Sequence, residues 1–321
     1  MLSICIPAYT YVDYTVEAVS VLLKEPEDFE IVAVEDFDLV AADPDMARRI
    51  AHARELFGSD PRIVWRRNGE PRPIQDNWNF TVDLASRPYV KLMGADDRIC
   101  PGGVSKILTM IRSAPTVHFH GHLARIIDGD GHIVRLQRPY VRSRACHRTG
   151  SNDALRLKLR QIARFKEPAC NLFTKDAWRR VSGYSRQYRF CFDIDFNIKV
   201  MREHDCCLWN EYVVDLRRHA RSDGATLPPD LALDELRQLI DDIYRFLGTT
   251  STPSDRASGE AWLTYRLIEL GVARYRHSPR RMLEFLAANL RKVDLSFSTL
   301  ARVTGLLARR ACFNDVQRTL P

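Results

Sequence analysis

Apolar residues in the first hundred positions alternate between short continuous runs and helically spaced runs. Each continuous run is short enough for a buried strand, and these runs are 2–7, 29–34, 62–65 and 89–93. Between them, apolar residues recur every three to four positions, as on one helix face, over 12–24, 44–57 and 76–86. This alternation predicts an α/β fold with a mostly parallel sheet and helices on both faces.

Beyond residue 100 the pattern is less regular and becomes helical. Strands are predicted at 116–127, 131–138 and 208–216, the first two around an Asp128-Gly-Asp-Gly131 turn. Helices are predicted at 101–113, 152–165, 175–182, 193–204, 230–247, 256–276, 279–293 and 297–312. Pro228-Pro229 closes the mixed part, so we expect a domain over 1–228 and a helical C-terminal region over 229–321. Residues 249–255 are the best linker candidate.

The positive charge lies in the C-terminal region. The chain carries a net charge of +7, and residues 272–321 contain ten Lys or Arg against three acids, so the rest of the chain is balanced. A basic end of this kind fits an anionic membrane surface, a phosphorylated acceptor or nucleic acid, and it equally fits a solvated helical surface. Residues 298–312 have the pattern of a basic amphipathic helix, which is typical of peripheral membrane binding and also of a packed core helix.

The N-terminus and the cysteines predict a cytoplasmic protein. Met1 to Pro7 has no basic segment before its apolar run, as a signal peptide would, and no apolar stretch reaches the ~18–20 residues that cross a bilayer. None of the eight cysteines forms a Cys-x-x-Cys pair, which disfavours a disulfide framework or a zinc site. There is no Gly-x-Gly-x-x-Gly fingerprint or P-loop, which weighs against a dinucleotide enzyme or an NTPase.

Acidic pairs follow two of the predicted strands. Glu35-Asp36 ends the second strand and Asp96-Asp97 follows the fourth. Adjacent carboxylates repel each other, and a divalent cation that also binds phosphate oxygens would relieve this repulsion. Asp is also common in ordinary turns. Taken singly, His219 fits a surface residue and Asp193 and Asp195 fit charges at a helix N-terminus.

The order of these features resembles the family 2 glycosyltransferases over about residues 1–225. The matching segments are Ser3 to Tyr9, Glu35-Asp36, Asn77-Trp-Asn79, the strand of Tyr89 that leads to Asp96-Asp97, residues 171–197, and Arg218-His219. Two positions depart from the family pattern. Phe192 stands where an acid usually precedes Asp193, and Phe37-Asp38 stands where Gly-Ser usually follows the second strand.

The resemblance implies the GT-A fold and an inverting transfer of a hexosyl or deoxyhexosyl group from a nucleoside diphosphate. It assigns donor binding to Pro7, Ala8, Tyr9, Asp36, Asn79 and Asp96. It assigns Mn²⁺ or Mg²⁺ to Asp97 and His219, and the general base to Asp193, with Asp195 as the alternative base.

The resemblance favours a UDP- or dTDP-sugar donor and a glycan or lipid-linked acceptor in surface polysaccharide or glycolipid synthesis. Two alternatives stay open at this stage. One is glycosylation of modified nucleic acid bases, since the basic end could bind phosphates. The other is a non-catalytic protein that binds nucleotide sugars or anions.

Overall fold

Parallel strands form the N-terminal half of the sheet, as the short apolar runs predict. The computed structural model describes residues 1–9, 11–37, 43–140, 146–160, 168–219, 228–275, 277–294, 296 and 299–305. The strands of this half are β1 (Leu2–Ala8), β2 (Glu30–Glu35), β3 (Ile63–Arg67) and β4 (Tyr89–Leu92), in the order β3-β2-β1-β4. All three pairings among them are parallel.

The second half of the sheet is mixed, which the sequence did not predict. It continues from β4 through β9 (Asn171–Thr174), β6 (Phe119–Ile127), β10 (Cys206–Arg217) and β5 (Arg98–Ile99), with β7 (Ile133–Leu136) on β6 and β8 (Cys146–Thr149) on β10. β9 pairs antiparallel with both β4 and β6, whereas β6 and β10 run parallel. The short strands β5, β8 and β9 have too few residues to show a period in the sequence.

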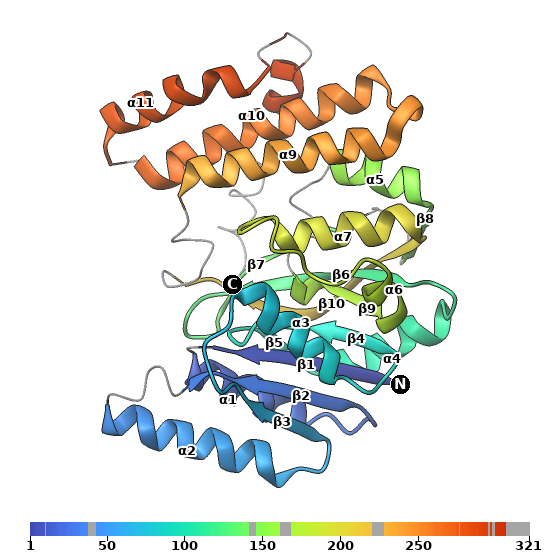
Figure 1. Cartoon of the computed structure of the whole chain (residues 1–321), viewed down its shortest axis with the longest axis vertical. Coiled ribbons are helices and arrows are strands. Elements are labelled where there is room, and N and C mark those ends of the chain that lie inside the picture. Colours follow the sequence, from blue (N-terminus) through green and yellow to red (C-terminus); the bar gives the residue numbers. More distant parts are fainter. Residues whose placement is uncertain are drawn as a thin grey trace. The chain divides into compact units, whose positions relative to one another are not determined.

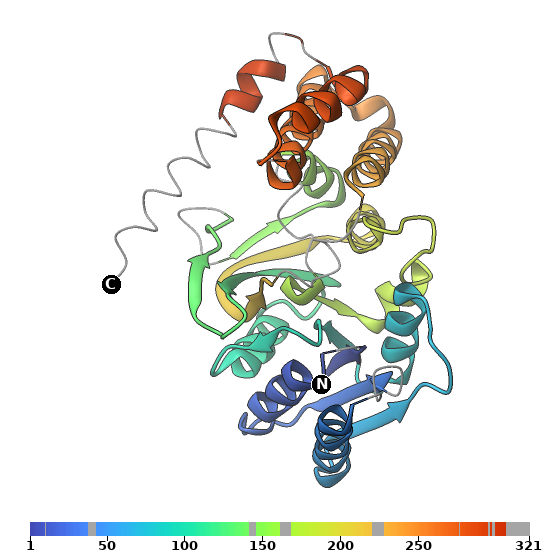
Figure 2. The same ribbon diagram turned by 90° about the vertical axis from the view of Figure 1, so that its left-hand side faces the viewer.

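Side chains alternate between the two faces of β1 and bring different helices to each face. Leu2, Ile4 and Ile6 belong to a core cluster that includes residues of α1 (Val12–Leu23), α2 (Pro44–Ser59) and α4 (Gly103–Ser113). The intervening Cys5 faces α3 (Ile74–Leu84), where its thiol lies 3.7 Å from the carbonyl oxygen of Thr81. Figure 2 shows α1 and α3 on opposite sides of these strands. A strand covered on both faces explains the continuous apolar run of β1.

The remaining helices follow the sequence pattern closely. They are α5 (Ser151–Arg160), α6 (Lys175–Arg180), α7 (Phe192–Glu203), α9 (Pro229–Leu247), α10 (Pro253–Tyr275) and α11 (Pro279–Asn289), with short 3₁₀ turns at Pro168–Cys170, Gly248–Thr250 and Leu290–Lys292 (Figure 1). The expected linker 249–255 is shorter than predicted, because α10 already begins at Pro253. Of the last predicted helix, 299–305 is helical and 306–312 lies outside the described residues.

Contacts divide the chain into two compact units. The first comprises 1–151, 165–186 and 192–219, and the second comprises 152–164, 187–191 and 220–321. The segment 187–191 joins the second unit because the Glu235 carboxylate of α9 accepts the backbone N–H groups of Arg189, Phe190 and Cys191. Such a backbone contact leaves no mark in the hydrophobic pattern. Within the same unit, Arg237 of α9 pairs with Glu260 of α10.

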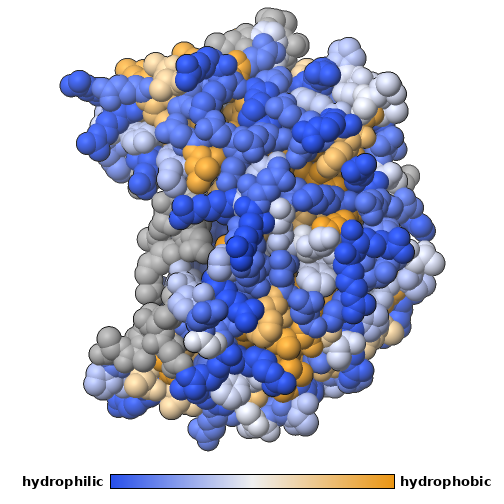
Figure 3. Space-filling view, in the orientation of Figure 1, coloured by the Kyte–Doolittle hydropathy of each residue, from blue (hydrophilic) through white to orange (hydrophobic). Residues whose placement is uncertain are grey.

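Among the residues that the structure describes, large exposed apolar side chains are few and occur in both units. They are Met1, Tyr9, Ile133, Val134, Leu136, Val272, Leu283, Leu290 and Leu300. The face in Figure 3 is mostly hydrophilic, with apolar residues in several separate areas. Among the described helices, none combines the length and the apolar character that crossing a bilayer requires.

Candidate active site

The carboxyl ends of six strands, β1, β2, β3, β4, β6 and β10, lie at one edge of the sheet. The two antiparallel steps from β4 to β9 and from β9 to β6 restore the strand direction. Therefore β6, and β10 parallel to it, run the same way as β1, β2 and β4. Ligands of open α/β sheets bind outside this edge. Four of the residues singled out in the sequence follow these strand ends: Asp36 follows β2, Asp96 and Asp97 follow β4, and His219 follows β10.

Asp96 and Asp97 lie on a tight turn beyond the end of β4. The Asp97 N–H donates to the Gly94 carbonyl (3.2 Å). A Cβ at Gly94 would stand 2.7 Å from Asp96 Oδ1 and 3.0 Å from Asp97 Oδ2. Both carboxylates therefore close over Gly94, which has no side chain to displace them. Asp97 is buried, and its Oδ1 accepts the backbone N–H of Arg217 (2.9 Å).

His219 joins the same group from the end of β10. Its Nε2 lies 3.0 Å from Asp96 Oδ2. The rings of Tyr11 and Tyr14, at the start of α1, pack against the imidazole with centroid distances of 5.0 and 5.5 Å. The sequence assigned His219 and Asp97 to a metal and Asp96 to the donor. The structure adds a direct contact between His219 and Asp96.

These side chains fit a divalent cation. Two carboxylates and one imidazole stand at the strand ends, and the side chains of Asp96 and His219 are 21% and 9% exposed, so a ligand can reach them. Carboxylate oxygens suit Mg²⁺ and Mn²⁺, and such ions usually complete their coordination with water and phosphate oxygens. Asp96, Asp97 and His219 thus supply oxygen and nitrogen ligands of the kind that hold a metal ion bound to a diphosphate.

A second acidic group lies on the β6–β7 turn. Asp128, Asp130 and His132 are the described residues that bring three ligand atoms within 4.8 Å of one another. Asp128 Oδ1 already accepts the N–H groups of Asp130 (3.0 Å) and His132 (2.9 Å), and these hydrogen bonds keep the pKa of this carboxyl low. These hydrogen bonds form a turn, and the turn by itself explains why the three side chains lie close together.

Asp36 lies at the end of β2 with open hydrogen-bonding capacity. Its N–H donates to the carbonyl of Ala8, the last residue of β1 (3.0 Å), and its side chain is buried. Burial raises the pKa of Asp36, and the backbone N–H of Arg72 and the amide of Asn68 oppose this rise. Within the described part of the chain, Asp36 Oδ2 and Asn68 Oδ1 are buried acceptors without a hydrogen-bond donor. Such acceptors are suited to N–H groups of a ligand.

The neighbouring acid, Glu35, has a structural role. It is 1% exposed, and its Oε1 lies 2.9 Å from Arg54 Nε and 3.2 Å from Arg67 Nε. Burial raises the pKa of Glu35, and the Arg54 hydrogen bond opposes this rise. Glu35 is thus neutralised by two arginines, whereas Asp36 has no ion pair of this kind among the described residues; Glu35 Oε2 and Asp36 Oδ2 are both buried acceptors without a donor there. Earlier in β1, Pro7 and Ala8 are buried, whereas Tyr9 is 47% exposed beyond the strand end.

Asn79 holds a turn in this structure. Its Oδ1 accepts the N–H of Tyr184 and its Nδ2 donates to the carbonyl of Tyr184, both at 2.8 Å. Gly183 has φ +65°, and a Cβ there would collide with Asn79 and Trp178. The amide that the resemblance assigned to the donor is therefore occupied mainly by the backbone of the 182–184 turn.

Asp193 and Asp195 have different surroundings in the first turn of α7. Asp195 is 3% exposed, and its carboxylate lies 2.6 Å from Lys199 Nζ. Asp193 is partly exposed. Beside it, the ring of Trp78 packs on Phe192 and Tyr184, with centroid distances of 4.9 and 5.4 Å. Asp193 therefore offers the more accessible carboxylate.

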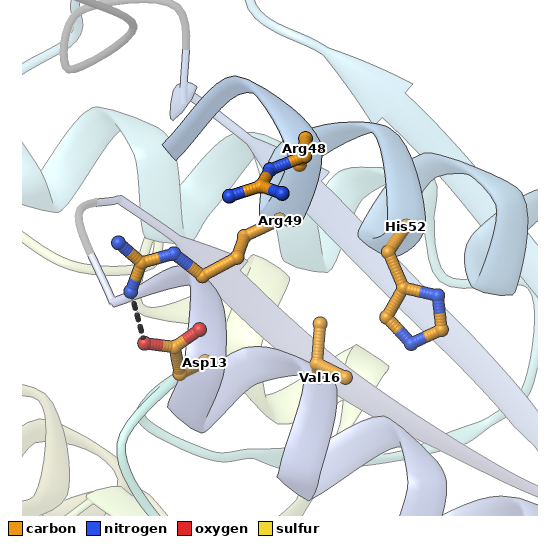
Figure 4. A pocket seen from close by; sticks show the side chains of 5 residues that line it. All are labelled: Asp13, Val16, Arg48, Arg49 and His52. Atoms are coloured by element: carbon orange, nitrogen blue, oxygen red, sulfur yellow. Dashed lines mark hydrogen bonds and ion pairs between the residues drawn. The ribbon is translucent and has the colours of Figure 1, made fainter. Parts of the chain in front are cut away.

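A surface hollow between α1 and α2 takes no part in this arrangement. Asp13, Val16, Arg48, Arg49 and His52 line it (Figure 4). Its two arginines are already paired, Arg49 with Asp13 (2.8 Å) and Arg48 with Asp45 (2.6 Å). None of the strand-end residues contributes to the hollow.

Comparison with known proteins agrees with this geometry. The family model for glycosyl transferase family 2 matches residues 3–182, more than half of the chain. The chain belongs to glycosyl transferase family 2. No curated protein matches. The membership confirms the resemblance seen in the sequence and makes this protein a glycosyltransferase.

Solved structures share the GT-A fold of this glycosyltransferase. S. aureus TarS 1–349 in complex with UDP-GlcNAc has a TM-score of 0.63 at 12% identity, with 91% of this chain and 81% of that chain covered. The mannosyltransferase PcManGT from Pyrobaculum calidifontis in complex with GDP-Man and Mn²⁺ has a TM-score of 0.54 at 14% identity, with 97% and 79% covered. At these identities the likeness shows the fold.

Substitution of Gly94 tests whether the two carboxylates depend on the space above it. We expect Gly94→Ala to weaken Mn²⁺ binding by about 10–100-fold, because the new Cβ displaces Asp96 and Asp97. Mn²⁺ titration followed by electron paramagnetic resonance measures this. Gly58→Ala is the matched control, since a Cβ at Gly58 meets no atom within 4 Å. Equal Mn²⁺ affinity in Gly94→Ala and wild type would contradict the assignment.

Proposed function

We propose that this glycosyltransferase moves a sugar from a nucleoside diphosphate to an acceptor hydroxyl with inversion at the anomeric carbon. The observation that carries the proposal is the row of groups along one sheet edge. Asp36 offers a buried acceptor at the end of β2, and Asp96, Asp97 and His219 gather beyond β4 and β10. The order of these groups along the edge matches the order of the parts of a donor: the nucleobase at Asp36, then the diphosphate with its cation at Asp96, Asp97 and His219.

Asp96, Asp97 and His219 would hold Mn²⁺ or Mg²⁺ against the diphosphate. The cation, when bound, stabilises the negative charge that develops on the departing nucleoside diphosphate. Asp36 would accept a hydrogen bond from the base. Asp97 is already fixed by the Arg217 amide, so its carboxylate is oriented before the donor arrives.

Asp193 would accept the proton of the acceptor. The acceptor oxygen forms a bond to the anomeric carbon, the bond from that carbon to the phosphate oxygen breaks, and the hydroxyl proton passes to Asp193. The partial exposure of Asp193 supports this role over Asp195, whose carboxylate is buried against Lys199.

The proposed donor class is supported by solved structures of similar fold. The complexes of TarS with UDP-GlcNAc and of PcManGT with GDP-Man support a nucleoside-diphosphate sugar for this chain. A UDP- or dTDP-sugar is favoured, and the acceptor is a glycan or lipid-linked glycan of surface polysaccharide synthesis. These substrates rest on resemblance to the family.

Replacement of Asp193, the proposed general base, separates catalysis from donor binding. We expect Asp193→Asn to lower the transfer rate by about 10²–10⁴-fold while donor affinity is kept, because the amide cannot accept the proton. The measurement is release of nucleoside diphosphate in the presence of acceptor, beside a donor titration. Asp176→Asn is the control, an acid in the first turn of α6. A variant as active as wild type would remove Asp193 from this role.

Thermal unfolding with a panel of nucleotides identifies the donor class. We expect UDP or dTDP with Mn²⁺ to raise the unfolding temperature, since a hundredfold excess over the dissociation constant adds ~2.7 kcal/mol to the unfolding free energy. Asp97→Ala should abolish the dependence on Mn²⁺, and Asp36→Ala should weaken binding of every nucleotide. GDP is included in the panel. No shift with any nucleotide would contradict the donor site.

The exposed face of α11 supports membrane association at the inner surface. Leu283 and Ala287 are exposed at helical spacing on α11, with Leu283 63% exposed, and Arg281 on the helix and Arg291 in the 3₁₀ turn after it are exposed as well. We expect the protein to sediment with anionic phosphatidylglycerol vesicles at low salt and to stay free with neutral ones. Leu283→Glu should abolish sedimentation, and the exposed Val134→Glu on β7 should not. Absence of binding at low salt would end this proposal.

A further inference from the structure

Arg217, the last residue of β10, is a buried arginine that the sequence did not single out. It is 2% exposed. Its Nε donates to the carbonyl of Asp96 (2.8 Å), Nη1 to the carbonyl of Gly129 (2.8 Å), and Nη2 to the carboxylate of Glu17 (2.6 Å). All three nitrogens of the guanidinium are therefore engaged, and each faces a different segment of the chain.

The same residue holds both acids beyond β4. Its side chain binds the backbone carbonyl of Asp96, and its backbone N–H donates to the Asp97 carboxylate (2.9 Å). One contact fixes the path of the turn, and the other fixes the orientation of a carboxylate. The two acids thus share a single partner that lies about 120 residues away in the chain.

Arg217 also supports the ring that packs on His219. Its guanidinium carbon lies 4.3 Å from the ring centroid of Tyr14, and Tyr14 packs on the imidazole of His219 at 5.5 Å. A cation over an aromatic face is attractive, and more so away from water. Arg217 therefore contacts both Asp96 and Asp97 and one wall of the histidine, which are the groups assigned to the cation.

The charge of Arg217 is balanced by Glu17 of α1. Arg98 binds the same carboxylate and also Asp215, and Arg125 binds Asp215 with two nitrogens. A buried guanidinium is stable only when its charge and its N–H groups are matched in this way. The pairing joins α1 to the end of β10, and so to the turn of Asp96.

We propose that Arg217 is the positioning residue that holds Asp96, Asp97 and His219 in one arrangement, and so sets the affinity of this edge for a divalent cation. The proposal rests on the function proposed above. Lysine would keep the charge but not the planar set of donors that reaches three segments together. Arg217→Lys therefore tests geometry rather than charge.

The test compares Arg217→Lys with Arg125→Lys in the full chain. Arg125→Lys removes a two-nitrogen ion pair from the same network and has no contact with the turn of Asp96. We expect Arg217→Lys to weaken Mn²⁺ binding, followed by electron paramagnetic resonance, by about 10–100-fold, and Arg125→Lys to leave it unchanged. Unfolding temperatures measured beside these titrations show whether both variants lose stability to a similar extent.

Amide hydrogen exchange of the metal-free protein gives a second readout. We expect exchange in peptides covering 94–97 to be faster in Arg217→Lys and unchanged in Arg125→Lys, because Arg217 donates to Asp96 and Asp97 whereas the bonds of Arg125 go to Asp215. Faster exchange without any Mn²⁺ binding by wild type would keep the positioning role and refute the proposed cation site. Equal exchange in the two variants, or unchanged Mn²⁺ affinity in Arg217→Lys, would overturn the proposal.

Discussion

Repulsion between two adjacent carboxylates is the constraint around which the site is built. Oxygens of Asp96 and Asp97 both lie within 3.0 Å of the position that a Gly94 Cβ would take. Like charges at ~4 Å repel by about 4 kcal/mol at an effective dielectric constant near 20. The fold opposes this repulsion with the backbone N–H of Arg217, which donates to the Asp97 carboxylate, and with the charge of Lys91, which is fully buried in β4.

Lys91 is a core residue whose positive charge interacts with the Asp97 carboxylate. Its Nζ lies 2.8 Å from His122 Nε2 and also donates to the Ala169 carbonyl. Burial lowers the pKa of Lys91 to about 8, and the negative charge of Asp97 acts in the opposite direction. Lys91 of β4 thus interacts electrostatically with Asp97, and the guanidinium of Arg217 from β10 binds the backbone of Asp96.

The strand-end acids were accessible to prediction because periodicity locates strands. Asp36, Asp96 and Asp97 follow continuous apolar runs, and parallel strands bring such ends together. Gly94 and Arg217 were not accessible, because their roles depend on Cβ clearance and on backbone carbonyls far away in the chain. Asn79 shows another contact that periodicity does not predict, since its amide binds the backbone of Tyr184.

The topology of the sheet was predictable only in its parallel half. Periodicity indicates where strands are but not which strand lies between two others. The four residues of β9 enter between β4 and β6, and this insertion lets β10 run parallel to β1 and present His219 at the same edge. The histidine could therefore be assigned by resemblance, while its physical route to Asp96 needed the structure.

β9 pairs with β4 but is synthesised much later than β4. β4 ends at Leu92 and β9 begins at Asn171, so the free edge of β4 has no partner while the intervening residues are made. At 5–20 residues per second this takes roughly 4–16 s. An open strand edge can pair with other chains during that time. The ribosome-bound intermediate therefore carries an unpaired strand edge, which a chaperone would protect from pairing with other chains.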